Sequence, residues 1–268
     1  MKTGVIFRRA MRDSRKAILG WGILCGMLGL WIGVFYPAVD DVLASVSTLL
    51  ENPFIKGLVG NVSDFATPAG WVGTKFLIML PLLMAVYSVL FNNNATAGEE
   101  DRGTIDLVLA TPTPRWQLIA EKAAAFLVAS FLILAQASLG LMAAILITPS
   151  LTIPVWNVFP AFMNVLPIML FLGAVALLLG TLLRSRQMAL GFAAAYIVGS
   201  YFVDTLASLS PGGLLNVLKV FSPFHYFDGP TALTQGLHPV MFLGFTVLAF
   251  VLLLVSMYAF QRRDLVGG

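Results

Sequence analysis

The stretch from Asn164 to Leu183, NVLPIMLFLGAVALLLGTLL, decides the fold because it is long, apolar and free of charged side chains. A helix needs roughly 20 such residues to cross the hydrocarbon core of a bilayer. Apolar stretches of comparable length recur on both sides of it. We therefore predict six transmembrane helices, near residues 18–36, 76–91, 123–147, 164–183, 188–209 and 240–260.

The composition of the whole chain supports a membrane location. Hydrophobic residues make up 59% of the 268 residues, charged residues make up 11%, and the mean hydropathy is +0.90. A soluble domain needs more polar surface than this. Residues 1–268 are therefore predicted to form one all-α integral membrane domain in contact with the lipid bilayer. The single cysteine, Cys25, excludes a disulfide framework and a thiolate metal site.

Lys and Arg residues are unevenly divided between the two sides of the predicted bundle. Of the 16 such residues, only Lys56, Lys75 and Lys219 fall on one side. Because these side chains resist translocation, the side on which they gather is the cytoplasmic one. We therefore predict a multi-pass protein of the cell's inner (plasma) membrane with both termini in the cytoplasm.

The segment before the first span is strongly basic and has a helical period. Its charges do not share a face with the apolar Phe7, Met11 and Ile18, which indicates an N-terminal interfacial helix on the anionic inner leaflet. The alternative is that the charges only set the topology. The basic residues of this predicted helix are Arg8, Arg9, Arg12, Arg15 and Lys16.

The first span carries a stripe of small residues, Gly22, Gly26, Gly29 and Gly33. Small residues let a second helix approach closely in lipid, where no hydrophobic force drives helices together. We expect a helix-packing face here, and a contact with a second chain is one interpretation. The other is that glycine is simply frequent in membrane helices. Polar residues inside spans, such as Asn164, are expected mainly to bond neighbouring helices.

The segment before the last span is apolar but repeatedly interrupted. Such a segment cannot form a clean span, and it can lie at membrane depth only where protein or water satisfies its backbone. We predict short re-entrant helices in the outer leaflet. The interrupting residues are Pro211, Gly212, Gly213, Pro223, Pro230 and Gly236.

Residues 92–122, between the second and third predicted spans, hold most of the acidic residues on the inner side. The segment is predicted to form two short helices around a Pro-rich turn, with Thr113 as N-cap and Pro114 at the first position of the second helix. A charged, amphipathic hairpin of this kind is suited to receive force from a soluble partner. The alternative is an ordinary solvated loop.

The sequence of this hairpin resembles a known family. EEDRGTIDLVLATP at residues 99–112, continued by Arg115 and Lys122, is similar to the acidic, Gly-Thr, Leu-rich, Thr-Pro pattern of type-2 ABC exporter permeases. Two shorter stretches support the resemblance, SPFHYFD at 222–228 and RRDL at 262–265. The resemblance extends over nearly the whole chain.

The resemblance implies that the hairpin contains a coupling helix that docks on an ATP-binding subunit. It also implies two such ABC subunits, which would carry ATP and Mg, and a second permease, identical or related, to complete the pathway. The implied contact residues are Glu99, Glu100, Asp101, Arg102, Gly103, Thr104, Asp106, Leu107, Thr111, Pro112 and Arg115.

The chain itself is not expected to be an enzyme. It contains no Gly-Lys dipeptide and therefore lacks the phosphate-binding loop of P-loop ATPases, so the energy has to come from a partner. We expect no cofactor on this chain, no metal, no catalytic residue and no nucleic-acid partner.

Two other functions fit the sequence less well. An ion-coupled secondary transporter is the alternative, but it would bury ionisable residues near the membrane midplane, and the predicted spans contain mainly Asp204, toward an outer end. An intramembrane enzyme using Glu99, Glu100 and His225 is disfavoured, because the predicted topology separates the acids from the histidine by a bilayer.

Overall fold

The computed structural model describes residues 4–38, 40, 67–95, 115–183, 185–209 and 213–262. Within these ranges the chain forms helices and connections, with no strand. The described residues include six helical stretches that are long and apolar enough to cross a membrane, as predicted. These are Val5–Ala38, Pro68–Asn92, Trp116–Ile147, Val155–Leu182, Arg186–Ser208 and Pro239–Arg262.

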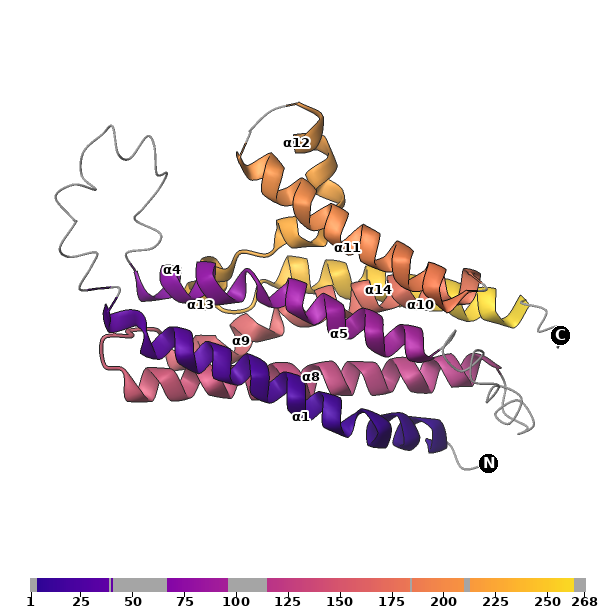
Figure 1. Cartoon of the computed structure of the whole chain (residues 1–268), viewed down its shortest axis with the longest axis horizontal. Helices are drawn as coiled ribbons and strands as arrows, with labels where there is room; N and C mark the ends of the chain where they lie inside the picture. Colours follow the sequence, from indigo (N-terminus) through magenta and orange to yellow (C-terminus); the bar gives the residue numbers. More distant parts are fainter. Residues whose placement is uncertain are drawn as a thin grey trace.

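The long helices lie side by side along one axis, and both ends of the described chain lie at the same end of the bundle (Figure 1). Helix α11 diverges from the others toward α12. The six long helices are α1 (Val5–Val34), α5 (Leu80–Ala95), α8 (Arg115–Ile147), α10 (Val165–Leu182), α11 (Arg186–Leu209) and α14 (Pro239–Arg262).

Helix α10 is the centre of the bundle and contacts α5, α8, α11 and α14. Buried residues occur all around it, as expected for a helix whose sequence is apolar on every side. Gly173 makes the packing possible, because a Cβ atom there would meet the Phe126 ring of α8 and the Asn92 side chain of α5. The apolar stretch from Asn164 to Leu183, which is the fourth predicted span, thus forms the core of the protein.

Helices α1 and α8 form the closest pair of neighbours and run in the same direction (Figure 1). The four glycines of the α1 stripe are buried, and a Cβ atom on Gly22, Gly26 or Gly33 would meet α8. A Cβ atom on Gly29 would meet the Phe76 ring and Leu141. On α8, Gly140 lies directly against the backbone of Gly26. The stripe therefore packs against α8 and Phe76 of the same chain.

The basic segment is helical but is not a separate interfacial helix. Helix α1 continues without interruption from Val5 to Val34, so the segment is the first part of the spanning helix. Nothing between Arg8 and Ile18 breaks the helix, because the segment contains no glycine or proline and many good helix formers. The predicted division of faces is present: Ile18 is buried, whereas the basic side chains are exposed.

Short helices lie at the other end of the bundle, some within the spanning stretches and some in the connections between them. The connection from α11 to α14 contains four of them, and Pro223, Gly229, Pro230 and Gly236 lie at the boundaries of the last two. Their insertion into the outer leaflet stays a prediction. The short elements are α4 (Pro68–Val72), η2 (Gly73–Leu77), α9 (Val155–Met163), α12 (Leu214–Leu218), η3 (Lys219–Phe221), η4 (Pro223–Tyr226) and α13 (Gly229–Gln235).

Candidate functional site

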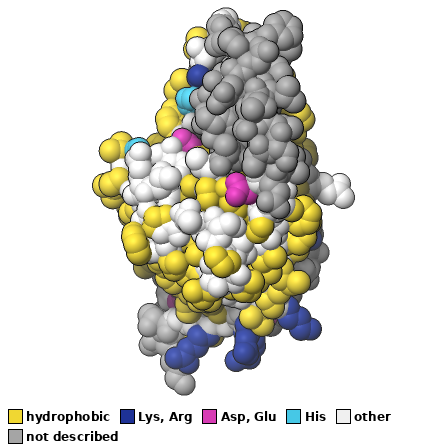
Figure 2. Space-filling view, turned by 90° about the vertical axis from the view of Figure 1, so that its left-hand side faces the viewer, with side chains coloured by type: hydrophobic (Ala, Val, Ile, Leu, Met, Phe, Trp, Pro, Cys, Tyr) yellow, Lys and Arg dark blue, Asp and Glu magenta, His cyan; other side chains and the backbone are white. Residues whose placement is uncertain are grey.

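One end of the bundle collects most of the described Lys and Arg residues, and we call it the basic end. Helices α1, α8 and α11 begin there, and α5, α10 and α14 end there (Figure 1). Figure 2 looks onto the opposite end, where the described side chains in view are hydrophobic or uncharged except for a few acidic, histidine and basic ones in the upper half, and further Lys and Arg side chains are visible at the lower edge. The described side chains that define the basic end are Arg8, Arg9, Arg12, Arg15, Lys16, Lys122, Arg186 and Arg262.

The segment that contains the predicted coupling residues connects two helices whose ends lie at the basic end. Residues 96–114 lie outside the described residues, and with them all the predicted contact residues from Glu99 to Pro112. Helix α5 ends at Ala95 and α8 begins at Arg115, so both attachment points of the segment are at the basic end. The helix predicted to begin after Thr113 runs without a break into the third span.

A carboxylate on α8 caps the N-terminus of α1. The backbone N–H of Gly4 donates to Glu121 Oε1 at 3.0 Å, and that of Phe7 donates to Glu121 Oε2 at 3.0 Å. The Gln117 amide, one turn earlier on α8, also donates to Glu121 Oε1 at 2.8 Å. The two ends of this contact are 117 positions apart in the sequence.

This contact replaces a cap that α1 lacks. The first N–H groups of any helix have no partner within the helix and carry partial positive charge. Gly4, at the N-cap position with φ 92°, has no side chain that can accept from them. The Glu121 carboxylate satisfies two of these donors from a neighbouring helix, six residues after the start of α8 at Arg115. Sequence reasoning identified Glu121 only as one acid of the hairpin and missed this role.

A contact between a histidine and an acid lies at the opposite end. His225 Nδ1 on η4 lies 3.3 Å from Asp204 Oδ1 near the end of α11, and both side chains are partly exposed. The pair therefore ties the short helices to α11. Within the described ranges, no three His, Cys, Asp or Glu side chains gather as metal ligands would.

A comparison with known families decides the class of protein. The model of the family "Multidrug efflux system permease Rv1217c, C-terminal domain" matches residues 7–261. The chain belongs to this permease family. A search of curated proteins finds no match. The six apolar helices and the family together define a multi-pass membrane permease.

The cap on α1 predicts that removing the Glu121 carboxylate loosens the first turn of this helix. Glu121→Ala should free the Gly4 and Phe7 N–H groups and cost the first turn about 1 kcal/mol, the usual value of an N-cap. The amides of residues 5–8 should then exchange hydrogen about fivefold faster, as measured by hydrogen–deuterium exchange. Gln117→Ala, which removes a neighbour of Glu121 but not the cap, is the matched control. Unchanged exchange in Glu121→Ala would show that the carboxylate does not hold this turn.

Proposed function

We propose that the chain is the membrane-spanning subunit of an ATP-binding-cassette exporter that expels amphipathic molecules. Its family consists of multidrug efflux permeases by description, and residues 99–112 resemble the coupling segment of type-2 ABC exporters. The observation that carries the proposal is the attachment of this segment: it connects two spanning helices at the basic end, where Glu121 ties one of them to α1.

In this proposal a soluble ATPase subunit pushes on residues 96–114, and α8 carries the movement through the membrane. Helix α8 has 33 residues, which corresponds to about 50 Å, longer than a bilayer is thick. It is bound to α1 by the cap at the basic end and by the glycine stripe along its length. The pair α1–α8 would therefore move as one body against α10 and α14, opening a path between them.

The partners in this proposal are two ABC ATP-binding subunits, which would hold ATP and Mg, and a second permease. Helix α11 contacts its own chain mainly through α5, α10 and the short helices. The opposite side of α11 exposes large apolar side chains such as Phe192 and Phe202. A second permease or lipid would cover this side.

The proposal is tested by reversing two charges in the segment. Glu99→Lys combined with Glu100→Lys should abolish association with the ATPase, or lower ATP-driven export at least about tenfold, because lysines placed where the partner is complementary to carboxylates meet like charge and are repelled. Membrane insertion should remain normal. The measurement is gentle detergent purification, identification of co-purifying chains, and export of a fluorescent substrate from proteoliposomes containing the complex.

The matched control is a second pair of adjacent acids, Asp40 and Asp41, which lies in the connection predicted for the opposite side. Reversing both to Lys should leave association unchanged. Normal assembly and full export in the Glu99/Glu100 double variant would overturn the coupling role. Export that follows a proton gradient, needs no nucleotide and is lost in Asp204→Asn would favour an ion-coupled transporter instead.

A further inference from the structure

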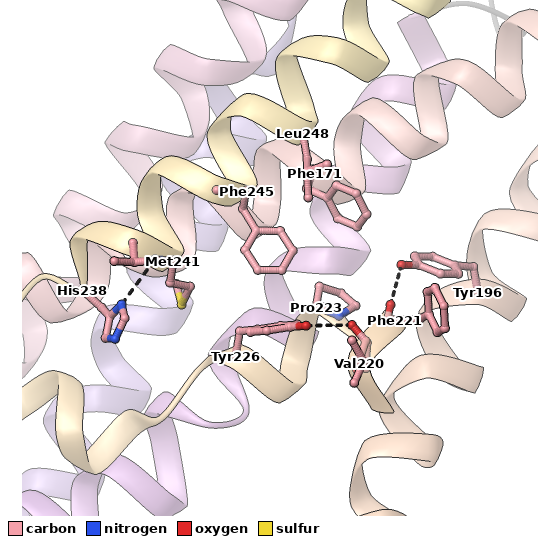
Figure 3. Close-up of a pocket in the computed structure, with 13 residues that line it drawn as sticks. Phe171, Tyr196, Val220, Phe221, Pro223, Tyr226, His238, Met241, Phe245 and Leu248 are labelled. Carbon is pink, nitrogen blue, oxygen red and sulfur yellow. Dashed lines mark hydrogen bonds between the residues drawn. The ribbon is translucent and has the colours of Figure 1, made fainter. Parts of the chain in front are cut away.

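A cavity of about 690 Å³ lies between α11 and α14, with α10 behind it and η3 and η4 on one side (Figure 3). Its volume falls in the range of pockets that hold drug-sized molecules. Five aromatic side chains from five helical elements line it, together with one histidine. They are Phe171, Tyr196, Phe221, Tyr226, Phe245 and His238.

Internal hydrogen bonds hold the aromatic walls in place. The Tyr196 hydroxyl on α11 donates to the carbonyl oxygen of Phe221 at 3.2 Å, and the Tyr226 hydroxyl donates to that of Val220 at 3.0 Å (Figure 3). Both phenol protons are therefore used within the protein. Phe245 packs edge to face against Tyr226 and Phe171, with ring centroids 5.6 and 5.5 Å apart. The walls thus offer fixed aromatic surfaces to an occupant.

Few polar groups line the pocket. No Asp, Glu, Lys or Arg is among the described residues that line it. The Nδ1 atom of His238 accepts the N–H of Met241 at 3.3 Å. A neutral imidazole that accepts at Nδ1 carries its proton on Nε2. His238 therefore provides a hydrogen-bond donor, and a charged occupant would find no counter-charge on the walls.

The position of the pocket favours entry from lipid. On α14 it extends from Val240 to Leu248, about 12 Å along the helix axis and so within the depth of one leaflet. Its rim is apolar and exposed, with Val240 at 77% and Phe221 at 74% exposure. In a membrane, such a rim faces acyl chains, from which an apolar molecule can pass sideways into the cavity.

We propose that this pocket binds an uncharged aromatic molecule that enters from the lipid and offers a hydrogen-bond acceptor to His238. That the occupant is cargo for export rests on the proposed function. The binding itself does not, because the pocket is formed within one chain. A binding measurement on the purified chain, without ATPase or nucleotide, therefore fails or succeeds independently of the coupling experiment.

Gly244 is a position at which the pocket can be filled by a substitution. It lines the pocket on α14, and a Cβ atom placed on it meets nothing within 4 Å, so a larger side chain can grow into the cavity without a clash. Gly20 on α1 is the matched control, since its Cβ also meets nothing within 4 Å and it is remote from the pocket. Val220→Trp fills the pocket from the opposite wall, which makes the result independent of α14.

The probe is Nile red, an uncharged aromatic dye with a carbonyl acceptor, titrated onto the chain in nanodiscs and compared with empty nanodiscs. We expect saturable binding to the unaltered chain, and Kd values at least about tenfold higher in Gly244→Leu and in Val220→Trp, because the filled cavity no longer holds a drug-sized ligand. Gly20→Leu should bind as the unaltered chain does.

Several outcomes would overturn the proposal. Fluorescence no greater than that of empty nanodiscs would show that lipid fills the cavity. Equal affinity in both filled variants would place the dye elsewhere. Tighter binding of ethidium, a cationic aromatic dye, than of Nile red would show that the occupant is charged and held by cation–π contacts with the rings.

Discussion

A chain in which leucine replaces Gly140 is expected to lose the folded six-helix bundle. A Cβ atom at Gly140 would overlap the backbone oxygen, carbonyl carbon and Cα of Gly26 on α1. No rotamer relieves this clash, because the obstacle is backbone and not a flexible side chain. The two helices have to separate along their closest contact, and overpacking of this kind costs about 3 kcal/mol or more.

The loss is measured by gel filtration and by thermal unfolding of the purified protein. Gly140→Leu should elute as aggregate or unfold at a clearly lower temperature, and Gly140→Ala should show the same effect in weaker form. Gly20→Leu on α1 adds the same side chain where nothing lies within 4 Å and should leave both measurements unchanged. A normal elution profile and unfolding temperature for Gly140→Leu would contradict the α1–α8 contact.

Asn164→Leu is expected to be the second most damaging change. The Asn164 side chain is 2% exposed and sits at the junction of α9 and α10. Its Nδ2 donates to the carbonyl oxygen of Gly236 at 2.9 Å, and its Oδ1 accepts the N–H of His238 at 2.8 Å. Leucine would leave the carbonyl oxygen of Gly236 buried without a partner, at about 1–3 kcal/mol, and would also remove the acceptor of the part-buried His238 N–H. The connection between α13 and α14 would lose its anchor.

The chain contains a matched control for this change. Asn157 on α9 also donates its side-chain amide to a backbone oxygen, that of Thr234 at 2.7 Å, but this bond is exposed. Asn157→Leu should therefore lower the unfolding temperature much less than Asn164→Leu. Equal effects in the two variants would show that burial of the Asn164 bonds is not what stabilises the junction.

Hydropathy locates the spans well but does not find where the helices end. The fourth span was predicted at 164–183, and α10 covers Val165–Leu182, but the helical stretch long enough to cross a membrane begins earlier, at Val155. The first span was predicted to begin at residue 18, whereas α1 begins at Val5. Hydropathy identifies the apolar residues that can lie in the hydrocarbon core of the bilayer. A helix continues beyond them wherever the adjoining polar residues are good helix formers.

Contacts between distant residues were beyond the sequence analysis. The Glu121 cap depends on the approach of α8 to Gly4, and the aromatic pocket depends on the angle at which α11 leaves the bundle. Neither follows from a local period or motif. The role of Asn164 was partly predictable, because a polar amide inside an apolar span needs a partner. Its two partners, however, lie more than 70 positions away.

The common direction of α1 and α8 has an electrostatic consequence. Two parallel helices place their positive dipole ends together, each equivalent to about half a unit charge, and here five basic side chains lie beside them on α1. The Glu121 carboxylate supplies an internal counter-ion for this concentration of positive charge. We therefore expect the exposed arginines to attract the phosphates of adjacent lipid headgroups, which would let the bilayer itself fix the depth of this end.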